Sequence, residues 1–149
     1  EPSEISAAFA LIQLKNLSNN IKRRQEVFEE HTKFLSDYSQ WISLPQQTVS
    51  SHTGWLAYPI VISEKAPFTR REVQIFLENR NIQTRVVFTG NILRQPGFKS
   101  INCVGRADEF KVADEVMKGG MLMACHHGLT EEHMQHIHDS MEIFFSNYR

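Results

Sequence analysis

The chain has 149 residues, of which 41% are hydrophobic and 22% are charged, as in an ordinary globular domain. Sixteen basic residues against seventeen acidic ones give a net charge of -1, which argues against a general affinity for nucleic acid or anionic membranes. Two cysteines cannot build a disulfide framework and favour a reducing compartment, and no apolar run reaches the roughly 20 residues of a membrane span.

The first 40 residues predict one long helix. Pro2 and the acidic Glu4 are typical of a helix start, and apolar residues recur at steps of three and four to about Asp37. A helix of this length exceeds the usual globular range, so we expect packing along a second body or a break near residues 18–20. The apolar stripe consists of Ile5, Ala8, Phe9, Ile12, Leu17, Ile21, Phe28 and Leu35.

The next segments alternate between strand and helix patterns. Residues 56–62, 82–88 and 121–124 are apolar or β-branched and predict strands. Pro59 cannot donate a ladder hydrogen bond, which favours an edge position or a strand start. Residues 44–54 and 90–105 predict loops.

Two further helices and a third at the end have recognisable starts. Thr69 and Glu72 form a capping box for a helix that ends near Asn79. Asp108 is placed to cap a helix that Gly119 and Gly120 close. The last helix begins at residues 130–132, and its inner side carries Met134, Ile137, Met141, Phe144 and Phe145.

This order of elements predicts an α+β fold. We expect a small antiparallel or mixed sheet of three to four strands, with one face covered by the first and last helices. Residues 1–40 would form a long connecting helix, and residues 41–149 would form a small domain within the same folding unit.

Histidines gather near the end of the chain. His133 and His136 lie one helical turn apart, but their spacing matches no metal motif with a third ligand of its own, so we expect no metal site and assign His133 and His138 to solvated helix faces. His126 and His127 end a predicted strand just before a helix, a position that can line a cleft. They fit hydrogen bonding to a phosphate or sugar hydroxyl, acid–base chemistry, or equally a structural turn.

Residues 83–96 are the richest in ligand-binding chemistry. Forked and bidentate groups cluster there beside an aromatic residue, and Gly90 would let the backbone approach a ligand. The alternative is that Arg85 pairs with a local carboxylate. The segment contains no Gly-x-Gly-x-x-Gly or P-loop pattern, and the chain contains no Gly-x-Ser-x-Gly nucleophile motif. The polar candidates are Arg85, Asn91, Arg94 and Gln95.

Three segments together resemble a known family. Residues 4–17 followed by Arg23-Arg24 resemble the helix after the active site of the DegT/DnrJ/EryC1/StrS sugar aminotransferases, which depend on pyridoxal phosphate. Residues 82–96 and 113–129 are similar to the branch of nucleotide-sugar 3-dehydratases that acts on substrates such as CDP-4-keto-6-deoxyglucose.

The resemblance implies a homodimeric, cytoplasmic enzyme for deoxysugar or lipopolysaccharide biosynthesis, with a large N-terminal domain and a small C-terminal domain. Because the chain begins Glu1-Pro2 without methionine, we expect it to be the C-terminal part of a longer chain. Pyridoxal phosphate would be bound mainly by the large domain, none of the lysines here resembles the Schiff-base lysine, and this part alone would be inactive. It would supply no catalytic residue but would contact the nucleotide sugar through Arg85, Asn91, Arg94, His126 and His127.

Two other classes of function stay open from the residues alone. The chain could be a free-standing, non-catalytic domain that binds a small molecule or dimerises through the exposed flank of its first helix. Metal-dependent hydrolysis through the histidines is the weakest alternative.

Overall fold

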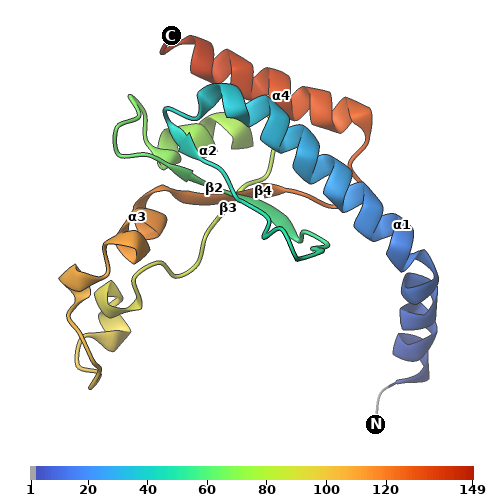
Figure 1. Cartoon of the computed structure of the whole chain (residues 1–149), viewed down its shortest axis with the longest axis horizontal. Coiled ribbons are helices and arrows are strands. Elements are labelled where there is room, and N and C mark those ends of the chain that lie inside the picture. Colours follow the sequence, from blue (N-terminus) through green and yellow to red (C-terminus); the bar gives the residue numbers. More distant parts are fainter. Residues whose placement is uncertain (1–2) are drawn as a thin grey trace.

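A computed structural model of the chain describes residues 3–149. Helices and strands alternate, with short 3-10 turns between them (Figure 1). The predicted α+β class is confirmed, and the predicted helix start at Pro2 lies outside the described residues. The elements are α1 (Glu4–Leu35), β1 (Ile42–Ser43), β2 (Ala57–Ile62), α2 (Arg70–Glu78), β3 (Arg85–Val86), α3 (Lys111–Gly119), β4 (Gly120–Ala124) and α4 (Glu131–Ser146).

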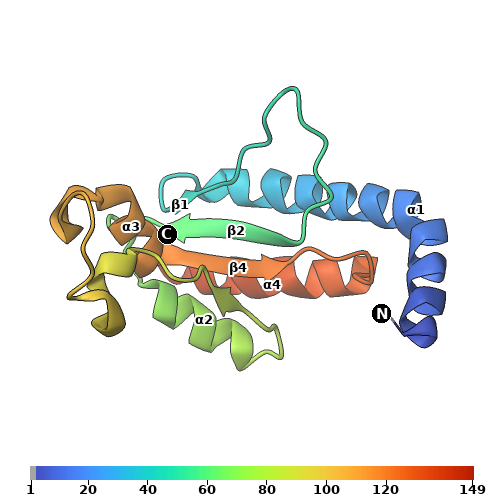
Figure 2. The same cartoon turned by 90° about the horizontal axis from the view of Figure 1, so that it is seen from below.

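The four strands form one antiparallel sheet in the order β1-β2-β4-β3. Its centre is the pair β2–β4, which runs from Ala57 opposite Ala124 to Val61 opposite Gly120 (Figure 2). Figure 1 shows α1, α2 and α4 on one side of this sheet, whereas the chain between β3 and α3 extends on the other side. The sheet therefore has one face covered by helices and one that this chain leaves more open.

The position of β2 corrects the prediction for Pro59. The strand is internal, because β1 pairs with one of its edges and β4 with the other. However, β1 reaches only Val61 and Ile62, so Pro59 has a partner strand on one side alone. A proline is tolerated at such a locally free edge, since no ladder bond is lost there.

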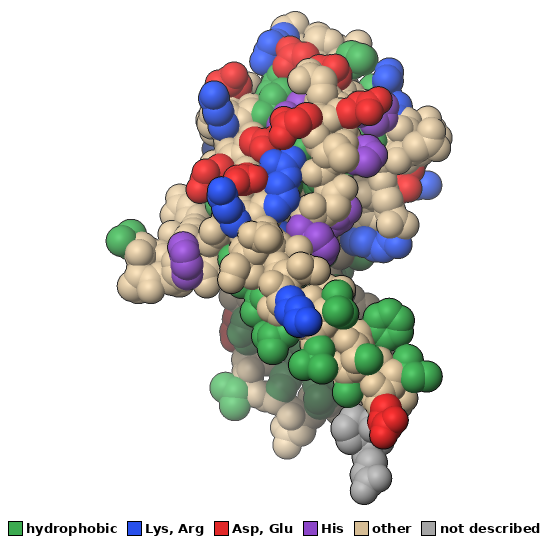
Figure 3. All heavy atoms as spheres, turned by 90° about the vertical axis from the view of Figure 1, so that its right-hand side faces the viewer, with side chains coloured by type: hydrophobic (Ala, Val, Ile, Leu, Met, Phe, Trp, Pro, Cys, Tyr) green, Lys and Arg blue, Asp and Glu red, His purple; other side chains and the backbone are tan. Residues whose placement is uncertain are grey.

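Helix α1 is continuous through residues 18–20, so of the two predicted alternatives the break is wrong. Its second half packs on the sheet, whereas the first half projects from the body and bends away (Figures 1 and 2). Figure 3 shows hydrophobic side chains gathered on this projecting part and charged side chains on the body above it. The exposed apolar residues of this half are Ile5, Phe9, Leu11, Ile12, Leu14 and Leu17.

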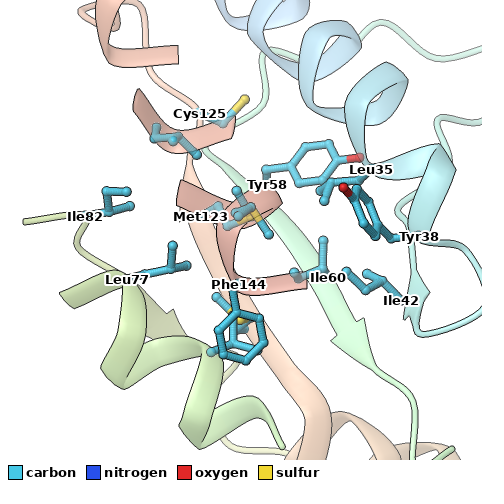
Figure 4. Close-up of a cluster of buried hydrophobic side chains, with 14 of the residues drawn as sticks. Leu35, Tyr38, Ile42, Tyr58, Ile60, Leu77, Ile82, Met123, Cys125 and Phe144 are labelled. Carbon is cyan, nitrogen blue, oxygen red and sulfur yellow. The ribbon is translucent and has the colours of Figure 1, made fainter. Parts of the chain in front are cut away.

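The covered face of the sheet and the helices build one hydrophobic core. Alternate residues of β2 point into it, and Tyr58 lies opposite Met123 and Ile60 opposite Met121. Figure 4 shows Leu35 of α1 beside Tyr58 at this core. All five residues predicted for the inner side of α4 are buried. These elements of the chain therefore share one buried core.

The predicted start of α2 is confirmed, whereas the predicted cap of α3 is wrong. The capping box of Thr69 and Glu72 is present at the start of α2. Asp108 does not cap α3, because the helix begins at Lys111 after a separate 3-10 turn and the Asp108 carboxylate accepts hydrogen bonds from Arg106 instead.

Candidate functional site

A pocket of about 460 Å³ lies between β3, the end of β4 and the first turns of α4. Its apolar lining includes Ile82, Met123, Leu129 and Ile137, which belong to the core. None of the lining residues that the structure describes is acidic. A concave apolar surface with a few polar groups is the usual form of a small-molecule site. The polar lining side chains include Asn81, Gln83, Arg85, His126, His133 and His136.

Arg85 reaches this pocket from β3, where it lies opposite Leu122 of β4. Its side chain is exposed, and its Nη1 donates to the carbonyl oxygen of Thr84 at 2.9 Å. The nearby carboxylate of Glu78 accepts from the backbone N–H and the hydroxyl of Thr84. Among the residues 3–149, Arg85 forms no ion pair within 4.0 Å. The hydrogen bonds from Thr84 lower the pKa of Glu78, and the nearby positive charge of Arg85 lowers it further.

His126 lies on the connection between β4 and α4, and helix α1 holds this connection in place. Arg24 Nη1 donates to the carbonyl oxygens of Trp55 at 2.7 Å and Cys125 at 3.3 Å. Arg23 donates through Nε and Nη2 to the carbonyl oxygen of Leu129 at 3.2 and 3.1 Å. Hydrogen bonds from charged donors are stronger than neutral ones, so the backbone on both sides of His126 is fixed to α1.

His31 is a third residue of α1 that contacts the backbone at the end of β4. Its ring is fully buried, with Nε2 3.0 Å from the carbonyl oxygen of Ala124 and Nδ1 3.1 Å from Nε2 of His138. Burial lowers the pKa of His31 to about 4, so the ring is neutral near pH 7. His138 is half-buried and stacks on Phe34 at 4.4 Å, which corrects its prediction as a solvated residue.

His133 is exposed, as predicted, and it also lines the pocket. It occupies the third position of α4, where its Nδ1 accepts from the backbone N–H of the N-cap Thr130 at 3.2 Å. His126 is arranged in the same way, because its Nδ1 accepts from the N–H of Gly128 at 3.2 Å. The spacing Thr130-x-x-His133 indicates this arrangement in the sequence, because a side chain at the third helical position reaches back to the backbone N–H of the N-cap residue.

The predicted residues Asn91 and Arg94 lie elsewhere, at the turn that faces α3. Asn91 is buried and donates to Ala107 O and Asp114 Oδ1, both at 2.8 Å, while Arg94 Nη2 donates to Asp114 Oδ2 at 2.6 Å. The hydrogen bond from Arg94 is the main reason that the pKa of Asp114 falls to about 2. Gly90, with φ of 64°, approaches Met117 so closely that a Cβ would lie 2.2 Å from its Cβ. These residues hold the turn against α3.

The structure thus brings Arg85 and His126 together in one pocket and leaves the other three predicted residues outside its lining. His127 is exposed beside the pocket. All seven lysines of the chain are exposed, and none lines the pocket, so these residues do not offer a Schiff-base anchor there. Within the described part of the chain, no group of three or more His, Cys, Asp or Glu side chains is arranged to hold a metal ion. Likewise, no described helix is long and apolar enough to cross a membrane.

The arrangement of helices and sheet defines the chain as part of an aminotransferase-type fold. It matches the structure of Escherichia coli GDP-4-keto-6-deoxy-D-mannose-3-dehydratase with bound hydrated PLP, with a TM-score of 0.80 at 20% identity. The match covers 94% of this chain and 35% of that protein.

Residues 3–142 match the DegT/DnrJ/EryC1/StrS aminotransferase family, and the chain belongs to this family. It is 30% identical over 145 residues to the lipopolysaccharide biosynthesis protein RfbH of Salmonella typhimurium, covering 96% of this chain and 32% of that protein. It is 32% identical over 142 residues to the dTDP-4-dehydro-2,6-dideoxy-D-glucose 3-dehydratase of Saccharopolyspora spinosa, covering 95% of this chain and 30% of that protein. The chain therefore spans about a third of the length of the curated relatives it matches.

Proposed function

We propose that this chain is the C-terminal part of a pyridoxal-phosphate-dependent enzyme that acts on a nucleotide-linked 4-keto-6-deoxyhexose. The reaction would be dehydration at C3 or amino transfer, in deoxysugar or lipopolysaccharide biosynthesis. Residues 1–40 would be the connecting helix and residues 41–149 the small domain. The family membership and the dehydratase relative support this proposal.

The apolar first half of α1 is the observation that carries the proposal. Ile5, Phe9 and Leu14 are 70%, 68% and 66% exposed, and all three lie in the first half of α1. Figure 3 shows hydrophobic side chains gathered on this projecting part. Contiguous apolar surface of this kind marks contact with another folded body. In the proposed enzyme, that body is the large N-terminal domain of the same chain, within a homodimer.

The proposed roles of this part are binding and positioning. Arg85 and His126 would bind polar groups of the substrate at the pocket. The side chains of Asn91 and Arg94 donate hydrogen bonds to Asp114, and their role as substrate contacts stays a prediction. Bound pyridoxal phosphate would supply the electron sink for the chemistry at the sugar. Since no lysine of this chain lines the pocket, residues outside the chain would hold the cofactor.

Purification of the full-length protein that contains this chain tests the proposal. We expect a visible absorption band from bound pyridoxal phosphate, and conversion of a CDP- or dTDP-linked 4-keto-6-deoxyhexose detected by mass spectrometry. Arg85→Ala should abolish turnover with an unchanged circular dichroism spectrum, and Arg71→Ala, an exposed arginine of α2, serves as the control. A full-length protein without the cofactor band would refute the enzyme proposal.

A non-catalytic binding or dimerisation domain is the second candidate. The observation in its favour is that residues of this chain alone form a hydrophobic core and a pocket. In that case the 149-residue chain would form a stable dimer in light scattering, and Phe9→Asp would dissociate it. A monomer that takes up no ligand would exclude this candidate.

A further inference from the structure

A second pocket, of about 380 Å³, lies at the end of the β2–β4 pair that is farther from the pocket described above. It is formed by the end of β2, the turn that leads to α2, the first residues of α2 and the end of α3. Ala57 and Ala124 at one end of the strand pair line the first pocket, whereas Ile62 and Gly119 at the other end line the second. Figure 2 shows α3 beside this end of β2, with the projecting half of α1 at the opposite end of the sheet. The proposed function assigns no role to this pocket.

Arg70 lines this pocket without a partner of opposite charge. Its Nη1 donates to the carbonyl oxygen of Gly120 at 3.2 Å, and among residues 3–149 no carboxylate oxygen lies within 4.0 Å of its guanidinium. Its Nε is buried and makes no hydrogen bond to the described residues. A buried donor of a charged group is costly when it lacks an acceptor. Because the charge of a guanidinium is delocalised, an anion beside its Nη atoms would offset this cost.

Two glutamates also line the pocket, but both are already engaged. Oε2 of Glu72 accepts from the backbone N–H of Thr69 at 2.6 Å and from its hydroxyl at 2.8 Å, as the carboxylate of the capping box. These hydrogen bonds lower the pKa of Glu72, so it stays ionised in this role. Oε1 of Glu64 lies 2.8 Å from Nζ of Lys118. Of the two cationic side chains in the lining, Lys118 is therefore paired and Arg70 is not.

The remaining lining is largely apolar. A volume of about 380 Å³ lies within the range of small-molecule sites, so the ligand has a carbon body in addition to its anionic group. A guanidinium pairs with a carboxylate through two parallel hydrogen bonds. A phosphate would bring close to two negative charges beside Glu64 and Glu72, which favours the singly charged carboxylate. The apolar lining residues are Ile62, Ala66, Pro67 and Phe68.

We propose that this pocket binds an organic monocarboxylate, with the carboxylate on the guanidinium of Arg70 and the carbon body on Ala66 and Phe68. Phe68 is 4% exposed and packs edge-on against Phe144 at 5.1 Å, so this wall of the pocket is fixed by the core. Since Arg70 also donates to Gly120, the first residue of β4, one side chain connects the bound carboxylate to the central strand pair.

Titration of the full-length protein that contains this chain with hydrocinnamate, followed by saturation-transfer NMR of the ligand, tests the site. Hydrocinnamate carries one carboxylate on a short chain that ends in a phenyl ring. We expect saturable binding of the acid and binding weaker by about tenfold or more for its neutral amide, which has the same carbon body. Acetate, which lacks the carbon body, should also bind more weakly. Absence of hydrocinnamate binding, or equal affinities of the acid and the amide, would overturn the proposal.

The variant Arg70→Gln locates the binding at this pocket. It removes the positive charge, and we expect the affinity for hydrocinnamate to fall by about tenfold or more. The matched control is Arg71→Gln, which makes the same change at an exposed arginine of α2 that does not line the pocket, and it should leave the affinity unchanged. Unchanged affinity in Arg70→Gln would overturn the assignment.

The variant Ser63→Asp decides the question if Arg70→Gln lowers the melting temperature. Oγ of Ser63 accepts from the backbone N–H of Lys65 at 3.2 Å, and an aspartate can accept the same bond, so the turn should be preserved. The new carboxylate in the lining repels that of the ligand, so the affinity should fall by a similar factor, whereas Ser100→Asp, at an exposed serine outside the pocket, should not change it. Unchanged affinity in Ser63→Asp would then overturn the site. These outcomes do not depend on pyridoxal phosphate, so a failure of this site and a failure of the enzyme proposal are distinguishable.

Discussion

The buried His31–His138 pair makes the stability of this chain depend on pH. A carbonyl oxygen only accepts hydrogen bonds, so Nε2 of His31 carries the proton that is shared with Ala124 at 3.0 Å. Nδ1 of His31 then accepts from Nε2–H of His138 at 3.1 Å. A second proton on His31 would break this bond and charge a fully buried ring. For these reasons the pKa of His31 falls from 6.5 to about 4, with burial as the largest cause.

The sign and size of the effect follow from this pKa. Between pH 4 and 6.5 the unfolded chain binds more protons than the folded chain at this position, so the free energy of unfolding decreases as the pH falls. At about 1.4 kcal/mol per pKa unit, His31 accounts for a loss of about 3 kcal/mol across this range. The contribution is fully present above about pH 6.5.

Urea unfolding followed by circular dichroism at several pH values between about 7.5 and about 4 measures this loss. His31→Gln cannot titrate, so its unfolding free energy should lose about 3 kcal/mol less than that of the wild type over the range. A residual slope is expected, because burial also lowers the pKa values of His126 and His138. The control His52→Gln, at an exposed histidine, should follow the wild type. Parallel curves for the wild type and His31→Gln would refute the reasoning.

Three further substitutions test other contacts by urea unfolding. Asn91→Ala removes the buried donor to Ala107 and Asp114 and should cost about 1–3 kcal/mol, whereas a residue that served only a ligand would leave stability unchanged. Leu35→Ala leaves a cavity at a fully buried position and should cost about 2–5 kcal/mol with little change in the denaturant slope. Thr69→Ala removes the side-chain cap of α2 and should cost about 1 kcal/mol, and a cost near zero would show that Glu72 alone suffices to cap the helix.

Features of the fold that depend on neighbouring residues were predictable from the sequence. The capping box at Thr69 and the inner face of α4 follow from short-range spacing, and both are present. Strand β1 was missed because two residues, Ile42 and Ser43, carry no alternation and become a strand only through pairing with β2. The predicted strand 82–88 is reduced to Arg85 and Val86, because pairing with β4 at Leu122 and Met121 defines its extent.

The candidate site shows the same limit. Arg85 was recognisable by its residue type and His126 also by its position at a strand end, but their common pocket depends on the pairing of β3 with β4. Asn91 has the same polar character, yet it is buried because Asp114, 23 residues later, accepts from it. The residues next to Asn91 in the sequence do not indicate a partner at this distance along the chain. The orientation of His133, in contrast, depends on Thr130 three residues earlier and could have been predicted from the cap.

Helix α1 joins the two surfaces on which the proposed function rests. Its first half presents the exposed apolar residues, and its second half holds the backbone around His126 through Arg23 and Arg24. The helix has no break between these halves. Whatever body covers the apolar half is therefore linked through one continuous helix to the loop that carries His126. Because Arg23 and Arg24 donate to backbone carbonyls on both sides of His126, the loop takes its position from α1, and so does the pocket beside it.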